Sequence, residues 1–534
     1  MLTEVAQYIM VILFIFLLLW AGFILQHVLI GSNDILEVTI YSTAFGLAFL
    51  AIICVVLNFI WDISLISVGC SAILLSSLLF FRKPQKITFS LKKLTFPDKW
   101  ELFILLLIFC YGFLLRSNTL FDPLPKGQDA WAHMTFIQYI HCNHALPEFI
   151  PWIEPPRLVN LVTYPPGSHC ISALLSQPFP DVSFTLTKIF FLSVGTGSVL
   201  SSYVVFKPLL GKKGGLLSIF FVAVFVPHMI MTTEITAEAV SIFIFPLIPY
   251  LFYKKKMVAS GILLGGVIII HHFTAFAAGI SLLALAIIFC IRMRDTKYVF
   301  SFFGAALIGL ALSAPWWSQQ PFYLGIFYPD SSSAASQILF NPYTEMVSPL
   351  FIVLSMIGVF IFLKNRDQEY YLFLITWSVA LFISSQPTPV RFHPHRFLAF
   401  FVFPCSALAS MGLLSIQRRL NKPLFVFLLL LIFSAGYPPH FWPSVGEDNM
   451  VAAEWVQDST LDSVVYVYGR HYIFVYSLSH RKMYEIVDFD DPFTYRVSPT
   501  YFYDDAAWVP HDITQFGQFD KLYSCSGVVI FRIE

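Results

Sequence analysis

Apolar runs long enough to cross a lipid bilayer recur along most of this sequence, and they constrain its fold more than any other feature. A helix needs about 20 apolar residues to cross about 30 Å of hydrocarbon, whereas a membrane β-strand is about half as long and alternates in polarity. We therefore predict an all-α polytopic membrane protein with about 14 transmembrane helices. The predicted spans cover residues 8–30, 40–60, 63–81, 100–115, 182–206, 214–232, 236–252, 257–270, 274–291, 298–316, 346–363, 370–385, 397–415 and 423–437.

The composition supports this class and excludes others. Charged residues make up 12% of the chain, against about 25% in soluble domains. The formal net charge is zero and no basic patch stands out, which argues against a nucleic-acid partner. The eight cysteines form no CxxC motif, and most lie in apolar runs. Cys142 and Cys170 share one polar loop, so a disulfide between them is left open.

Lysine and arginine in the short loops predict the orientation, because cytoplasmic loops are enriched in these residues. When the spans are threaded in order, every basic cluster falls on the same side, which we take as cytoplasmic. The clusters lie at residues 82–93, 207–213, 254–256, 292–297, 364–366 and 418–422. The loop 116–165 and the tail then lie on the extracytoplasmic side.

The tail, residues 438–534, differs in composition from the rest. A short helix near 454–456 is followed by strand-like runs at 463–468, 471–477, 482–487 and 527–532. This pattern predicts a small extracytoplasmic α/β domain of about 95 residues, which is enough for a core. The transmembrane domain is accordingly predicted to occupy residues 1–437.

The loop 116–165 is the longest polar interruption before the tail. Asp129 precedes a helical pattern over residues 130–143, and His133 lies one turn later on the same face. The pair is a candidate catalytic site in which Asp129 acts as a general base, or in which both bind a divalent metal such as Mg or Mn. The alternative is that Asp129 only caps the helix. Tyr164 begins an apolar stretch, 164–176, of half a span, which predicts a re-entrant or interfacial helix.

Further polar residues fall at the outer ends of predicted spans. Glu238 lies one turn into an apolar helix, where an acid usually faces a cavity or pathway. His271 and His272 separate two apolar runs and are candidates for binding phosphate or moving protons. Each also has a structural alternative, as a turn residue or a helix cap.

Arg391, His393, His395 and Arg396 form the densest polar cluster on the outer side. Guanidinium groups bind phosphate oxygens in pairs, so this cluster predicts a phosphate clamp. The alternative is that these side chains reach toward lipid headgroups.

The sequence resembles the GT-C superfamily of polytopic glycosyltransferases, which includes protein mannosyltransferases, aminoarabinose transferases and oligosaccharyltransferase catalytic subunits. The resemblance rests on GQDAWAHMTFIQYI followed by LPE, on YPPGSHCISALLS, and on PHRFLAFFVFPCSALASMGLL. The order of parts is also similar: an acidic first outer loop, many spans and an outer soluble tail.

The resemblance implies that Asp129 is the catalytic base or a metal ligand, and that Arg391, His395 and Arg396 contact the phosphate of a lipid-linked donor. Trp131, Trp152 and Tyr164 are candidates to stack on sugar rings, and the alternative is that they are ordinary aromatic residues of the membrane interface. The sequence departs from the family pattern in three respects. Asp129 has no adjacent acid, the tail has no WWD-type motif, and three extra spans precede the acidic loop. The metal, the sugar and the acceptor are left open.

The expected function is transfer of a sugar from a polyprenyl-phosphate-linked donor to a glycan, lipid or protein acceptor at the outer face of the cell membrane. No nucleotide-binding motif is present, which favours a donor already activated in the membrane. One alternative is a polymerase or ligase of lipid-linked glycans. Another is a transporter or flippase, although the repeats typical of transporters are not seen. A third is a non-catalytic assembly protein.

Overall fold

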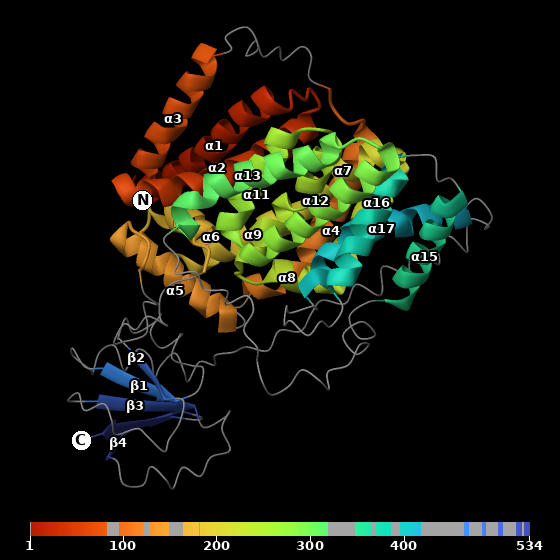
Figure 1. Ribbon diagram of the computed structural model, residues 1–534. Helices are drawn as coiled ribbons and strands as arrows, with labels where there is room; N and C mark the ends of the chain where they lie inside the picture. The colour runs from red at the N-terminus through yellow and green to blue at the C-terminus, as the bar shows by residue number, and fades with distance from the viewer. Residues whose placement is uncertain are drawn as a thin grey trace.

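The computed structural model describes residues 2–82, 95–121, 128–148, 164–180, 182–318, 348–364, 369–385 and 396–417, and five strands between residues 464 and 533. Up to residue 417 the described chain is almost wholly helical (Figure 1). The helices are α1 (Leu2–Leu29), α2 (Ile35–Ile60), α3 (Leu65–Arg82), α4 (Lys99–Arg116), α5 (Gln128–Asn143), α6 (Gly167–Ser176), α7 (Phe184–Val224), α8 (Val226–Thr233), α9 (Ala237–Ile244), α10 (Leu247–Tyr253), α11 (Met257–Ile270), α12 (His272–Met293), α13 (Lys297–Trp317), α15 (Pro349–Lys364), α16 (Glu369–Ser384) and α17 (Phe397–Gln417).

Within the described residues, seven helices are long and apolar enough to cross a membrane, and shorter apolar helices lie among them. Every predicted span before residue 418 falls on one helix or on two consecutive helices. Large apolar side chains such as Ile12, Leu106 and Phe300 are more than half exposed, as expected where a helix faces lipid. The structure therefore confirms a helical polytopic membrane protein. The span expected at 423–437 lies outside the described residues.

The spans predicted at 182–206 and 214–232 form α7 and α8, and the breaks between them have local causes. Gly211 interrupts α7 with φ of 72°, a backbone conformation that residues other than glycine rarely adopt. The second break follows at Phe225, whose backbone is extended, and Pro227 has no N–H to continue the helix. The first break lies within the basic cluster at 207–213.

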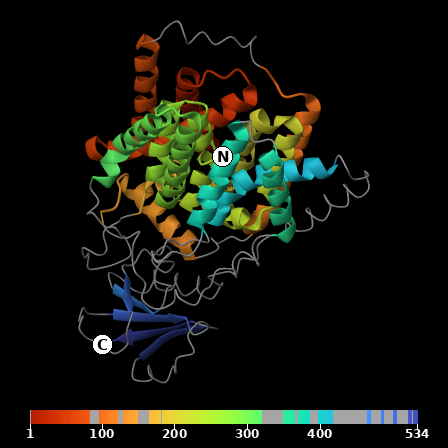
Figure 2. The same ribbon diagram turned by 45° about the vertical axis from the view of Figure 1, so that its right-hand side comes forward.

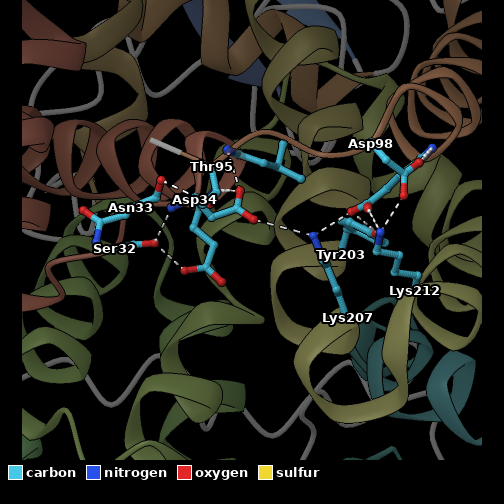
Figure 3. A network of polar contacts seen from close by, with 11 residues as sticks. Ser32, Asn33, Asp34, Thr95, Asp98, Tyr203, Lys207 and Lys212 are labelled. Atoms are coloured by element: carbon cyan, nitrogen blue, oxygen red, sulfur yellow. Dashed lines mark hydrogen bonds and ion pairs between the residues drawn. The ribbon is translucent and has the colours of Figure 1, made fainter. Parts of the chain in front are cut away.

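At the end of the helices where Gly211 lies, the buried carboxylate of Glu101 forms ion pairs with Lys207 and Lys212, which flank this glycine (Figure 3). Glu101 is 3% exposed. Its Oε1 lies 2.6 Å from Lys207 Nζ and accepts a hydrogen bond of 2.8 Å from the Tyr203 hydroxyl, and its Oε2 lies 3.1 Å from Lys212 Nζ. The contacts join α4 to both parts of α7.

Two exposed or half-buried acids extend this network (Figure 3). Asp98 caps α4 by accepting from the Glu101 backbone N–H at 2.8 Å, and its Oδ2 lies 2.5 Å from Lys212 Nζ. The hydrogen bond from Lys212 is the main reason that the pKa of Asp98 is lowered. Asp34 caps α2 and lies 3.5 Å from Lys207 Nζ. Lys256, from the basic cluster at 254–256, reaches the Leu29 carbonyl at 3.5 Å, and Leu29 is close in sequence to Asp34, which contacts Lys207. The clusters at 207–213 and 254–256, which were predicted on one side of the membrane, therefore lie at one end of the helices.

Replacing Glu101 with glutamine should destabilise the helical domain by about 2–4 kcal/mol, because one partner of a buried ion pair is removed while the lysines stay. Thermal unfolding of the detergent-purified chain would measure the change. The double variant Glu101→Gln/Lys207→Met should recover part of the loss, since it also removes the lysine closest to the lost carboxylate. An unchanged melting temperature for Glu101→Gln would contradict the role given to this carboxylate. Asp98→Asn, at an exposed site, is the matched control and should shift the melting temperature far less.

The predicted half-span at 164–176 forms α6, and all ten of its residues are buried. Its first residue allows close packing: a Cβ on Gly167 would lie 2.9 Å from both Ala51 Cβ and the Ile269 carbonyl oxygen. Helix α6 therefore packs mainly against α5 and α2 and touches α11 at Gly167, rather than lying on the lipid surface. Cys170, on α6, is a buried free thiol and Cys142 is an exposed one, so the two do not form a disulfide in this structure.

Five strands of the tail form one mixed sheet in the order β2-β1-β3-β5-β4. β1 (Val464–Tyr468) pairs in parallel with β2 (Met483–Ile486) and β3 (Thr500–Asp505), whereas β5 (Val528–Ile533) is antiparallel to β3 and β4 (Asp520–Cys525). β1, β2 and β5 were predicted from the sequence, and β3 and β4 were not. The strands lie apart from the helices (Figures 1 and 2). The strand expected at 471–477 and the helix near 454–456 lie outside the described residues.

Candidate functional site

A second cluster of ionisable side chains lies at the end of the helices opposite Lys254–Lys256. Helix α9 starts at Ala237 and its continuation α10 ends beside these lysines, while α11 starts beside them and ends at Ile270. Glu238, in the first turn of α9, and His271, directly after α11, are therefore both at the far end. Four segments far apart in the sequence meet there.

Glu238 and Arg396 form an ion pair across this cluster. Arg396 Nη1 lies 3.2 Å from Glu238 Oε1, and the carboxylate side chain is 6% exposed while that of the arginine is 29% exposed. Two effects favour the charge on Glu238: the arginine itself and the dipole at the N-terminus of α9. Arg396 directly precedes α17, so the pair ties the start of α17 to the start of α9.

His271 is oriented by the helix that follows it. Its Nδ1 accepts a hydrogen bond from the Thr274 backbone N–H at 3.3 Å, which makes it the N-cap of α12, and it also contacts the Thr274 hydroxyl at 2.8 Å. The Thr274 hydroxyl contacts Ser241 Oγ at 2.7 Å, which links α12 to α9. Because Nδ1 is an acceptor, the ring hydrogen of the neutral imidazole resides on Nε2. This Nε2 lies 3.5 Å from Glu238 Oε1.

Burial keeps the imidazole neutral. The pKa of His271 lies well below the usual histidine value, chiefly because the ring is fully buried, and the nearby His272 and Arg396 lower it further. Its tautomer is therefore fixed by the cap, and it can donate from Nε2 throughout the physiological pH range.

His133 meets a histidine of α6. His133 Nδ1 and His169 Nε2 are 2.7 Å apart, so one of the rings donates to the other. The Tyr164 ring lies beside this pair, 5.3 Å from the His133 centroid and 5.7 Å from that of His169. It also lies 5.7 Å from the ring of His272 and 6.2 Å from that of His271. The Tyr164 ring thus lies between the His133–His169 pair and the histidines next to Glu238.

The structure brings together six of the predicted site residues. The other four lie wholly or partly outside the described residues. Those that meet are His133, Tyr164, Glu238, His271, His272 and Arg396. Asp129 is the second residue of α5, one turn before His133, and its role as a base, a metal ligand or a cap stays a prediction. Its side chain, and all of Arg391, His393 and His395, lie outside the described part of the structure.

A fully buried arginine, Arg116, lies at the end of α4 with no carboxylate among its contacts. Its Nη1 donates to the Ala223 carbonyl at 3.0 Å, its Nε to Thr232 Oγ1 at 2.7 Å, and its Nη2 to His228 Nδ1 at 2.9 Å. The Ala223 carbonyl would accept from the N–H of residue 227 in a continuous helix, but that residue is Pro227. The guanidinium supplies the missing donor and holds the break between α7 and α8.

Sequence reasoning did not select His169, Arg116 or His228. His169 is a polar residue in a short apolar stretch, YPPGSHCISALLS, and this contrast was the signal available. Arg116 was counted as the first residue of the loop 116–165, and nothing local links it to residues more than 100 positions later.

The divalent-metal site expected at Asp129 and His133 includes the Asp129 side chain, which lies outside the described part of the structure. Among the described residues, no three histidine, cysteine, aspartate or glutamate side chains are grouped as they are around a metal ion. His133 Nδ1, a candidate ligand atom, is within hydrogen-bond distance of His169. The metal role expected for Asp129 and His133 therefore stays a prediction, and no step below depends on it.

Comparison with known proteins defines the class to which this fold belongs. No protein-family profile matches the sequence, and no curated protein matches it. Solved structures of polytopic membrane glycosyltransferases do match the fold. The apo oligosaccharyltransferase of Archaeoglobus fulgidus matches with a TM-score of 0.55 at 14% identity, over 74% of this chain and 65% of that one. The present chain therefore spans about two thirds of the length of that enzyme.

Two further structures give the same result. ArnT from Cupriavidus metallidurans, bound to undecaprenyl phosphate, matches with a TM-score of 0.56 at 12% identity, over 81% of this chain and 98% of that one. The Archaeoglobus oligosaccharyltransferase in complex with Zn and sulfate matches with a TM-score of 0.53 at 13% identity, over 80% and 72%. The chain has a GT-C-like membrane fold.

Proposed function

We propose that this protein is a glycosyltransferase that moves a sugar from a polyprenyl-phosphate-linked donor to an acceptor on the extracytoplasmic face of the membrane. The observation that supports it most is the buried cluster of Glu238, His271, Arg396, Tyr164 and His133 at the end of the bundle opposite the lysines. In the orientation predicted from the basic loops, that end lies at the outer leaflet, where lipid-linked substrates would reach it. The GT-C-like fold agrees with this class of reaction.

In the proposed reaction an acceptor hydroxyl attacks the anomeric carbon of the donor sugar, and the polyprenyl phosphate leaves. Asp129 accepts the hydroxyl proton as the general base. Arg391 and His395 neutralise the charge that develops on the leaving phosphate. Arg396 was expected from the sequence to take part in this clamp, but because its guanidinium is paired with Glu238 we assign it to the sugar side of the site.

A transfer assay tests the proposal directly. Membranes from cells that express the chain are supplied with undecaprenyl phosphate linked to radiolabelled hexoses or pentoses. We expect label to leave the lipid fraction for a glycan, lipid or protein product, and membranes without the chain to retain it. The size of the product separates transfer of one sugar from polymerisation. No movement of label from any donor would overturn the proposal.

A further inference from the structure

His271 presents a buried hydrogen-bond donor that has no partner. Its Nε2 is buried and, among the residues that the structure describes, makes no hydrogen bond. The nearest acceptor, Glu238 Oε1, is 3.5 Å away, which is longer than a normal N–H···O bond of about 2.9 Å. A buried donor without a partner is costly, so a group such as this one points to a ligand that supplies the acceptor. The capping bond to Thr274 holds the ring with Nε2 3.5 Å from Glu238 Oε1.

The three side chains together provide a hydrogen-bond acceptor and two hydrogen-bond donors close to one point. Glu238 is an acceptor, while His271 Nε2–H and the Arg396 guanidinium are donors, and both lie within 3.5 Å of the same carboxylate oxygen. A phosphate group at neutral pH only accepts hydrogen bonds and would meet the carboxylate charge. A hydroxyl group donates one bond and accepts others, so it satisfies the whole cluster.

We propose that Glu238, His271 and Arg396 form a subsite for a non-reacting hydroxyl group of the donor sugar. Glu238 accepts the hydroxyl hydrogen, and His271 and Arg396 donate to the hydroxyl oxygen. The ring of Tyr164 lies 6.2 Å from that of His271 and offers an apolar face for the sugar. The inference rests on the proposed function and adds the part of the substrate that this cluster recognises.

His271→Asn tests the subsite with little risk to the fold. Asparagine is a good N-cap residue and keeps an acceptor for the Thr274 N–H, but it lacks the Nε2–H donor. The purified full chain is titrated with undecaprenyl phosphate alone and with undecaprenyl phosphate linked to individual hexoses and pentoses. We expect His271→Asn and Glu238→Gln to weaken binding of the best sugar-linked donor about tenfold or more, and to leave the affinity for undecaprenyl phosphate within about twofold.

The matched control is His144→Asn. His144 lies beyond α5 with φ of 53°, a conformation that asparagine tolerates, and outside the cluster. It should leave both affinities unchanged. If His271→Asn weakens both ligands equally, the cluster binds phosphate and the subsite is rejected. If it changes neither, the cluster lies outside the donor site. If the wild-type chain binds none of these lipids, the proposed function itself fails, which is a separate result.

Discussion

Replacing Asp129 with asparagine should reduce sugar transfer by at least about 100-fold, while the amount of folded protein stays the same. Asparagine has almost the same shape but cannot take a proton, and a positioned general base contributes about 10²–10⁴-fold to rate. Asp129 is the second residue of α5, one turn before His133, which lies in the cluster around Tyr164. The rate of label transfer from undecaprenyl-phosphate-linked donor in membranes is the measurement.

Asp122 provides the control for this result. It is a second acid in the same loop, seven residues earlier and next to Pro123, where aspartate is an ordinary turn residue. Asp122→Asn should transfer sugar at the wild-type rate. Undiminished activity in Asp129→Asn would remove this residue from the reaction, and equal losses in both variants would indicate a general effect of loop charge.

Replacing Arg116 with methionine should destabilise the helical domain by about 3 kcal/mol or more. The guanidinium donates to the Ala223 carbonyl, to Thr232 and to His228, all inside the protein, and each acceptor left without a donor costs about 1–3 kcal/mol. Methionine fills a similar volume, so loss of packing contributes little. The melting temperature of the purified chain in detergent would show the effect, and a wild-type value would contradict it.

A double variant separates the proposed cause from a general loss of stability. Pro227→Ala restores a backbone N–H that can reach the Ala223 carbonyl. We expect Arg116→Met/Pro227→Ala to be about 1 kcal/mol less destabilised than the sum of the two single changes predicts. Strict additivity would mean that Arg116 does not act at this carbonyl. Because α8 leads directly into the turn before Glu238, we also expect Arg116→Met to lower sugar transfer and the double variant to regain part of that activity.

The sequence predicted the parts of this fold that depend on local composition. Apolar length located each described helix that crosses the bundle, and the half-length of residues 164–176 predicted a helix that does not span, which α6 is. Glu238 was selected because charge is costly at membrane depth, His271 because it separates two apolar runs, and Arg396 because it belongs to the densest outer polar cluster. Each span reverses the direction of the chain, so counting the spans in the sequence predicts that these three residues lie at the same end of the helices. Their catalytic and binding roles stay predictions.

Features that depend on distant partners could not be predicted in this way. The pairing of Arg116 with the Ala223 carbonyl requires a proline in one helix and an arginine in another, and either residue alone reads as a span end or a helix break. The tautomer of His271 depends on where α12 begins, which sequence locates only to within a few residues. β3 and β4 were missed because TYFYDD and DKLYSC carry charged ends that resemble loops.

The enclosure of α6 bears on how the chain is assembled during synthesis. Residues 167–176 leave the ribosome before residues 257–270, yet Gly167 packs against Ile269 in the finished protein. With ten residues, α6 is too short to be inserted as a stable span of its own. Helix α6 can pack on α2 and α5 first, but we expect its packing to stay incomplete until α11 has been delivered to the bilayer. A nascent chain halted near residue 250 should consequently hold α6 and its histidine accessible to water-soluble reagents, and extension past residue 270 should protect them.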